Sequence, residues 1–156
     1  MYKLVLRPNP QRGFILIAMS VCMFLLLAVV GMAFDLGRVY IARNEAQIFA
    51  DAASMAAAKQ LDGTAAGLDR ARAAVTALPN RWNLGTQDFS GVIIEFSADG
   101  KQWEAEPKEL KALHYARVTA PDNHVTILFL RAVGGPLSFK VPARAVASTD
   151  PVRLTE

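Results

Sequence analysis

Cysteine and histidine are scarce in this sequence of 156 residues, and their scarcity excludes several kinds of site. Cys22 is the only cysteine, so the chain cannot form an internal disulfide bond or a site with two thiolate ligands. The two histidines, His114 and His124, are ten residues apart, and no zinc-ligand pattern surrounds either of them. We therefore expect a fold held together by packing, without a metal ion or any other cofactor.

The sequence also lacks the motifs that mark common enzymes. No serine stands in a Gly-x-Ser-x-Gly turn, and Gly134-Gly135 is too short a glycine segment to hold a phosphate group. Glu104, Glu106 and Glu109 lie among lysines, which is typical of a solvated turn rather than of an acid/base pair. We predict that the protein is not an enzyme and has no small-molecule substrate.

Positive charge is confined to the beginning of the chain. The net charge is +3, and Lys3, Arg7 and Arg12 are the only charged residues before Asp35. Because the chain has 17 basic and 14 acidic residues in total, the part that follows residue 34 is neutral. A neutral domain lacks the basic face that nucleic acids require, so nucleic acid is excluded as the leading partner.

The longest uncharged run comprises the 21 residues 14–34. At about 1.5 Å per residue a helix of this length crosses the roughly 30 Å core of a lipid bilayer. We predict a basic cytoplasmic leader (1–13) and a transmembrane helix (14–34), because the cations before the run favour a cytoplasmic N-terminus. In a bacterium this topology places the chain in the inner membrane with the remaining residues in the periplasm.

The helix is expected to continue through an alanine-rich segment, residues 35–61, because only Gly37 interrupts it and a helix tolerates one glycine. This segment carries two apolar stripes. The first stripe consists of Val39, Ala42, Ala46, Phe49, Ala53 and Ala56. The second stripe consists of Ile41, Ile48 and Met55. One stripe suits the chain's own domain and the other a partner helix; alternatively, one concave domain covers both.

Residues 62–156 are predicted to form an α+β domain. Asp62-Gly63-Thr64 breaks the first helix, Thr64 caps a second one, and Pro79 ends it. A loop is expected at 80–91. About four mostly antiparallel strands are expected at 92–96, 102–105, 115–120 and 138–147, with a strand or short helix at 125–130. The expected fold is a long helix packed on a small sheet.

The junction Gln11-Arg12-Gly13-Phe14 resembles the site at which prepilins are cut, where a basic leader ends in glycine and the mature chain begins with phenylalanine. In that family the fifth mature residue is usually glutamate, whereas here it is Ala18. Two hypotheses therefore stay open: cleavage between Gly13 and Phe14, or a glycine at the edge of an uncut membrane span.

The polar positions that follow the apolar run resemble the TadE/TadG-like proteins of the tight-adherence (Flp) pilus-assembly system. The matching positions, called here the motif positions, are Asp35, Gly37, Arg38, Tyr40, Arg43, Gln47, Asp51, Ala52 and Ala53. The resemblance covers roughly residues 11–60. It implies a pilin-like fold, anchoring in the inner membrane, and a structural role beside other pilus-assembly subunits or pilins in making a bacterial surface appendage. The metal-binding D-x-S-x-S motif of longer TadG proteins is missing, so metal-dependent adhesion is not implied.

Asp35 stands directly after the apolar run and has two interpretations. It is either a carboxylate that docks onto a partner subunit or an interfacial charge paired with Arg38 at i+3.

Two other functions stay open beside a pilin-like assembly component. The first is a minor pilin that is cut after Gly13 and enters an extracellular filament. The second is a single-pass anchored binding or sensor module unrelated to pili.

Overall fold

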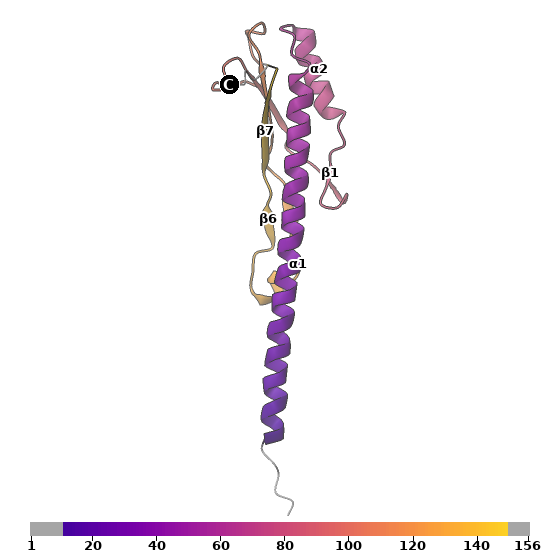
Figure 1. Ribbon diagram of the computed structural model, residues 1–156, viewed down its shortest axis with the longest axis vertical. Coiled ribbons are helices and arrows are strands. Elements are labelled where there is room, and N and C mark those ends of the chain that lie inside the picture. Colours follow the sequence, from indigo (N-terminus) through magenta and orange to yellow (C-terminus); the bar gives the residue numbers. More distant parts are fainter. Residues whose placement is uncertain (1–10, 150–156) are drawn as a thin grey trace, which may run out of the picture. The chain divides into compact units, whose positions relative to one another are not determined.

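The computed structural model describes residues 11–149, with side chains from residue 13 onward (Figure 1). The predictions made for Lys3, Arg7 and the side chain of Arg12 lie outside the described residues. The described chain divides into two compact units, which comprise residues 11–36 with 127–137, and residues 37–126 with 138–149.

Helix α1 (Gln11–Ala58) contributes to both units and is one continuous helix of 48 residues. It ends three residues before the predicted Leu61, because the amides of Gln60 and Leu61 bond to the carbonyls of Ala57 and Ala58 at 3.0 Å. These i to i−3 bonds tighten the last turn and stop the α-helical ladder. The second element of the first unit is the short 3₁₀ helix η1 (Leu130–Val133).

The second helix of the 37–126 unit begins as its sequence predicts. Helix α2 (Ala65–Thr76) is capped by Thr64, whose Oγ1 accepts a hydrogen bond from the amide of Gly67 at 3.0 Å. Its buried residues include Leu68, Ala71 and Val75.

A three-stranded antiparallel sheet in the order β3-β4-β7 forms the centre of this unit. Its strands are β3 (Ile93–Ser97), β4 (Tyr115–Ala120) and β7 (Ala143–Ser148). β4 matches the predicted strand, and its buried residues alternate along the sequence. The predicted strand at 102–105 is wrong: Glu104 makes a single bridge to Phe96, and Pro107, which lacks an amide hydrogen, follows three residues later.

Two further predictions are corrected by short antiparallel pairs. The expected loop at 80–91 contains a hairpin of β1 (Arg81–Trp82) and β2 (Gln87–Asp88). The run 138–147 is not one strand, because Pro142 interrupts it. Its first part, β6 (Ser138–Lys140), pairs with β5 (His124–Thr126), while its second part is β7. The region 125–130 is thereby divided between a strand and the approach to η1.

The core of this unit lies where α1 faces the sheet. Ala42, Ala46 and Ala53 of α1 are fully buried and belong to one apolar cluster with Phe96 and Val118. Figure 1 shows β7 beside the part of α1 that supplies these alanines. Small side chains let the helix backbone come close to the strands, so the first stripe forms the core face of α1. The observed helices and antiparallel sheets confirm the α+β class.

Candidate functional site

The motif positions of α1 fall into two groups in the structure. Asp35, Arg38 and Gln47 bond to backbone groups of the chain beyond residue 125, and Ala53 is buried in the core. The remaining positions are exposed or half-buried on α1. These are Gly37, Tyr40, Arg43, Asp51 and Ala52.

Asp35 is fully buried and binds a loop of its own unit. Its Oδ1 accepts a hydrogen bond from the amide of Leu128 at 3.0 Å. Its Oδ2 accepts from the amides of Phe129 and Leu130 at 2.8 and 2.7 Å. The amides of Phe129 and Leu130 lie at the start of η1 and that of Leu128 just precedes it, so one carboxylate satisfies three donors that have no intrahelical acceptor. The carboxylate thus holds residues 128–130 against α1, a role that neither sequence-based interpretation included.

Arg38 and Gln47 make comparable bonds within the second unit. Arg38 Nη1 donates to the carbonyl of Thr126 at 3.0 Å, immediately after β5. Gln47 Nε2 donates to the carbonyl of Arg144 in β7 at 3.2 Å and to Asp51 Oδ1 at 2.9 Å. All of the accepting groups beyond residue 125 are backbone atoms, so no side-chain pattern there could have revealed these contacts.

The second stripe remains uncovered in the described part of the chain. The exposed fractions of Ile41, Ile48 and Met55 are 42%, 68% and 52%. Residues of the first stripe are buried or half-buried over the same turns. The alternative in which one concave domain covers both stripes therefore does not apply to these residues, and α1 presents an apolar surface beside polar side chains.

A shallow apolar groove of about 250 Å³ lies beside Ile48. Phe49, Ala52, Leu78 and Phe89 form much of its lining, together with Pro79, Glu45 and Arg81. Phe89 stacks on Phe49 with ring centroids 4.4 Å apart, so the hairpin side of the groove is held by ring contacts to α1. The groove extends the second stripe from a row of three side chains to a broader apolar surface.

Glu45 shapes the hairpin next to this groove. Its Oε2 accepts from the amide of Asn83 at 2.6 Å, and both carboxylate oxygens lie 3.3 Å from the amide nitrogen of Leu84. Asn83 and Leu84 have φ of 54° and 60°, a region that side chains disfavour, particularly that of leucine. Trp82, immediately before them, is buried and stacks on Phe89 at 5.4 Å. Sequence reasoning missed Glu45 because it assigned residues 80–91 to an irregular loop.

Most of the apolar run before Asp35 is exposed, apart from the half-buried Ala28 and the buried Gly31. α1 is the described helix that is long and apolar enough to cross a membrane, and none of its most apolar stretch is buried. Phe14 is 74% exposed, and nothing surrounds the α-carbon of Gly13 within reach of an added side chain. An apolar surface of this size is unfavourable in water, so it needs lipid or protein around it.

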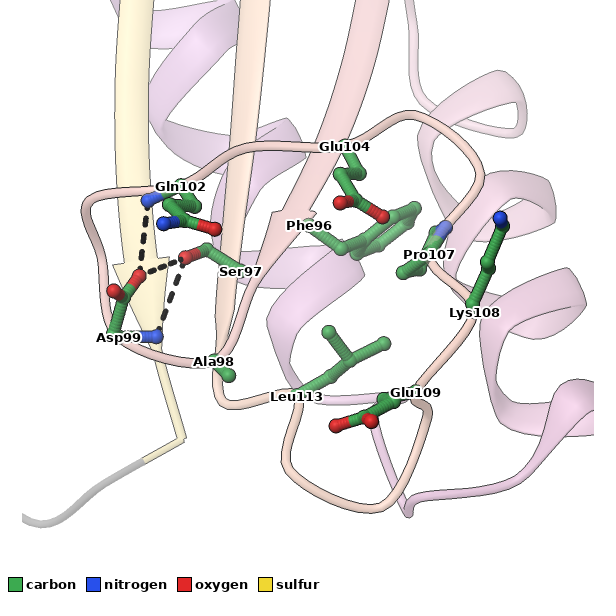
Figure 2. Close-up of a pocket in the computed structure, with 10 residues that line it drawn as sticks. All are labelled: Phe96, Ser97, Ala98, Asp99, Gln102, Glu104, Pro107, Lys108, Glu109 and Leu113. Carbon is green, nitrogen blue, oxygen red and sulfur yellow. Dashed lines mark hydrogen bonds between the residues drawn. The ribbon is translucent and has the colours of Figure 1, made fainter.

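A cavity of about 480 Å³ opens beside the end of β3 (Figure 2). Phe96 and Leu113 lie between Glu104 and Glu109, and Asp99 turns toward Ser97 and Gln102 (Figure 2). Asp99 Oδ1 accepts from the amides of Lys101 and Gln102, so this carboxylate stabilises the turn. Among the described residues no group of three or more acidic, histidine or cysteine side chains could hold a metal ion.

Comparison with known families identifies the same segment that the motif positions mark. Residues 13–60 match the family described as "Putative Flp pilus-assembly TadE/G-like". The match ends just after α1, so it includes neither α2 nor any of the sheets. No curated protein and no solved structure matches the chain.

Proposed function

We propose that this chain, which is TadE/TadG-like over residues 13–60, takes part in Flp pilus assembly as a membrane-anchored, non-enzymatic scaffold. Residues 14–34 cross the bacterial inner membrane, the leader 1–13 stays in the cytoplasm, and residues 35–156 occupy the periplasm. The uncovered second stripe packs against a helix of another pilus-assembly subunit or pilin.

One observation carries this proposal: α1 leaves two apolar surfaces uncovered in succession. Most side chains of the run 14–34 are exposed, as those of a helix in lipid are, and only the face around Ala28 and Gly31 is covered. The second stripe then follows on the same helix, where the first stripe is already used by the chain's own core. A helix partner fits the second stripe because Ile41, Ile48 and Met55 recur every seven residues.

Ile48→Asp tests the partner surface. Ile48 is 68% exposed, so the change leaves the core intact, but it buries a charge wherever a partner covers the groove. Loss of a central apolar contact costs about 2 kcal/mol or more, which corresponds to more than about a tenfold loss of affinity. We expect fewer pili on cells and a matching loss of pilus-assembly subunits that co-purify with the full-length protein.

The matched control is Val146→Asp, because Val146 is also an exposed apolar residue (49%) but lies on β7. This variant should keep pili and complexes at normal levels. Both proteins should unfold at the wild-type temperature in detergent, which separates lost binding from lost folding. Normal piliation and intact complexes with Ile48→Asp would contradict the proposed partner surface.

A second candidate, a minor pilin cut after Gly13, is favoured by the junction Gln11-Arg12-Gly13-Phe14. The mass of the intact protein from its native membrane decides between the two functions. A chain that begins at Phe14 supports incorporation into a filament, while a chain that retains residues 1–13 supports a permanent anchor. The family match gives no support to a sensor module unrelated to pili.

A further inference from the structure

The loop that Asp35 holds is itself strongly apolar. Residues 127–137 read Ile-Leu-Phe-Leu-Arg-Ala-Val-Gly-Gly-Pro-Leu, with Arg131 as the only charged residue. Ile127 is buried at the base of the loop. The large exposed side chains and their exposed fractions are Leu128 (53%), Phe129 (50%), Val133 (47%) and Leu137 (63%). Four large apolar side chains gathered on one short loop form a patch of the kind that marks an interaction surface.

Several contacts fix this loop against the end of the apolar run. The three hydrogen bonds to Asp35 hold its backbone. The ring of Phe129 meets the ring of Phe34 edge to face, with centroids 5.5 Å apart. Phe129 also lies directly on Gly31, where an added Cβ would come within 2.6 Å of the Phe129 Cβ. The loop closes on itself through the amide of Ile127 and the carbonyl of Leu137 at 3.0 Å.

These contacts determine how deep the loop must lie. Gly31 and Phe34 belong to residues 14–34, and Gly31 is about 4.5 Å below Phe34 along the helix axis. When residues 14–34 fill the bilayer, Phe129 is therefore level with the last turn of the membrane span. Its neighbours in the loop then meet the boundary between acyl chains and headgroups, where exposed apolar side chains are stabilised.

We infer that residues 127–137 form a second membrane-contacting element, which inserts Leu128, Phe129, Val133 and Leu137 into the outer interface of the bilayer that α1 crosses. Arg131 is exposed on the same loop, and its long side chain allows the guanidinium to reach the lipid phosphates. The inference rests on the proposed membrane span. Because the loop covers only the side of α1 that carries Gly31 and Asp35, it restricts rotation of the helix about its own axis.

Nitroxide labels on the full-length protein test this inference. In a Cys22→Ala background, single cysteines replace Leu128, Val133 or Leu137, all of which are exposed. The reference positions are Val30 in the span and Val146 on β7, with exposed fractions of 65% and 49%. Each labelled protein is reconstituted into vesicles of phosphatidylethanolamine and phosphatidylglycerol. Collisions with oxygen, which concentrates in lipid, are then compared with collisions with a water-soluble nickel complex.

We expect the oxygen-to-nickel ratio at the three loop positions to shift toward that of Val30 and away from that of Val146. Loop labels that behave like Val146, while Val30 remains in lipid, would overturn the inference and leave the proposed anchor intact. Loop labels shielded from both reagents would also overturn it, since a second protein copy would then cover the loop. A Val30 label exposed to nickel would instead refute the membrane span itself. Tryptophan fluorescence melts confirm that each labelled variant is folded.

Discussion

At the scale of single residues, polar side chains of α1 hold distant backbone segments in place. Asp35, Gln47 and Glu45 bond to residues 128–130, to Arg144 and to residues 83–84. The carboxylates of Asp35 and Glu45 accept from the amides of irregular segments, which lack a regular partner, whereas Gln47 donates to a carbonyl of strand β7. These contacts explain how a helix rich in alanine can define the path of loops that follow much later in the chain.

Asp35→Ala should loosen the 127–137 loop. The change removes the acceptor from three backbone amides, and unsatisfied buried donors cost about 1–3 kcal/mol each before relaxation. Water can replace some of the lost hydrogen bonds and so reduce this cost. We expect hydrogen exchange at residues 128–130 to accelerate by about a hundredfold in the full-length protein, equivalent to about 3 kcal/mol. Asp51→Ala is the control, because Asp51 is an exposed carboxylate of the same helix. Unchanged exchange at 128–130 would show that Asp35 does not hold the loop.

Asp99 makes the turn after β3 sensitive to acid. Hydrogen bonds from the amides of Gln102 and Lys101 lower the pKa of Asp99 to about 2, against an ordinary value of 3.8. Because the folded pKa is the lower one, the contribution is complete above pH 3.8 and is lost as the pH falls through about 2.

An Asp99→Ala variant provides the measurement. Its unfolding temperature should be lower than that of the wild type at pH 6, and the difference should shrink steadily between pH 4 and pH 2. A difference that stays constant over this range would mean that the charge of Asp99 does not hold the turn.

At the scale of elements, two cross-strand ion pairs differ sharply in how far their side chains are buried. On β3 and β4, Glu95 lies directly opposite Arg117, whose Nε and Nη2 approach Glu95 Oε2 at 2.7 and 2.6 Å. The guanidinium also lies 4.2 Å from the centre of the Trp103 ring. On β1 and β2, Arg81 and Asp88 are also opposite each other but are 3.8 Å apart and largely exposed.

Double-mutant cycles should separate these two pairs. Alanine replacement of Glu95 and Arg117, singly and together, should give a coupling of about 1 kcal/mol, because their side chains are only 23% and 14% exposed. The same cycle on Arg81 and Asp88 should give a coupling near zero, since water screens exposed charges. Urea unfolding of the full-length protein in detergent measures both. Equal couplings for the two pairs would contradict the role assigned to burial.

At the scale of the whole molecule, the proposed topology divides the chain between two compartments. The leader carries all of the charge that precedes Asp35, and this charge is positive, which favours retention in the cytoplasm. The neutral remainder carries no such bias. Orientation therefore depends on a few residues at the beginning of the chain.

Thiol labelling in cells tests this orientation. In the Cys22→Ala background, a cysteine in place of Lys101, an exposed residue of the turn after β3, should react with a membrane-impermeant maleimide in intact spheroplasts. A cysteine in place of Lys3 should react only after the membrane is opened. Reversal of the two results would show that the C-terminal part lies in the cytoplasm.

Local features of the chain could be predicted from the sequence because they depend on neighbouring residues. The long α1 follows from the absence of proline in an apolar and alanine-rich stretch, and α2 follows from Thr64 and Pro79. β4 follows from alternation, and its predicted bounds match those observed. The motif positions came from the resemblance to TadE/TadG-like proteins, and the family match covers the segment in which they lie.

The pairing between remote segments could instead be identified only from the tertiary structure. Pro142 is visible in the sequence, yet only the fold shows that it separates a strand paired with β5 from one paired with β4. Asp35 reads as an interfacial charge, but its three donors lie more than ninety residues away and are backbone amides. Every residue except proline carries such an amide, so the sequence does not indicate which residues bond to Asp35. Spacing and periodicity therefore determine the helices and one face of α1, whereas the loop that Asp35 holds is decided by three-dimensional proximity.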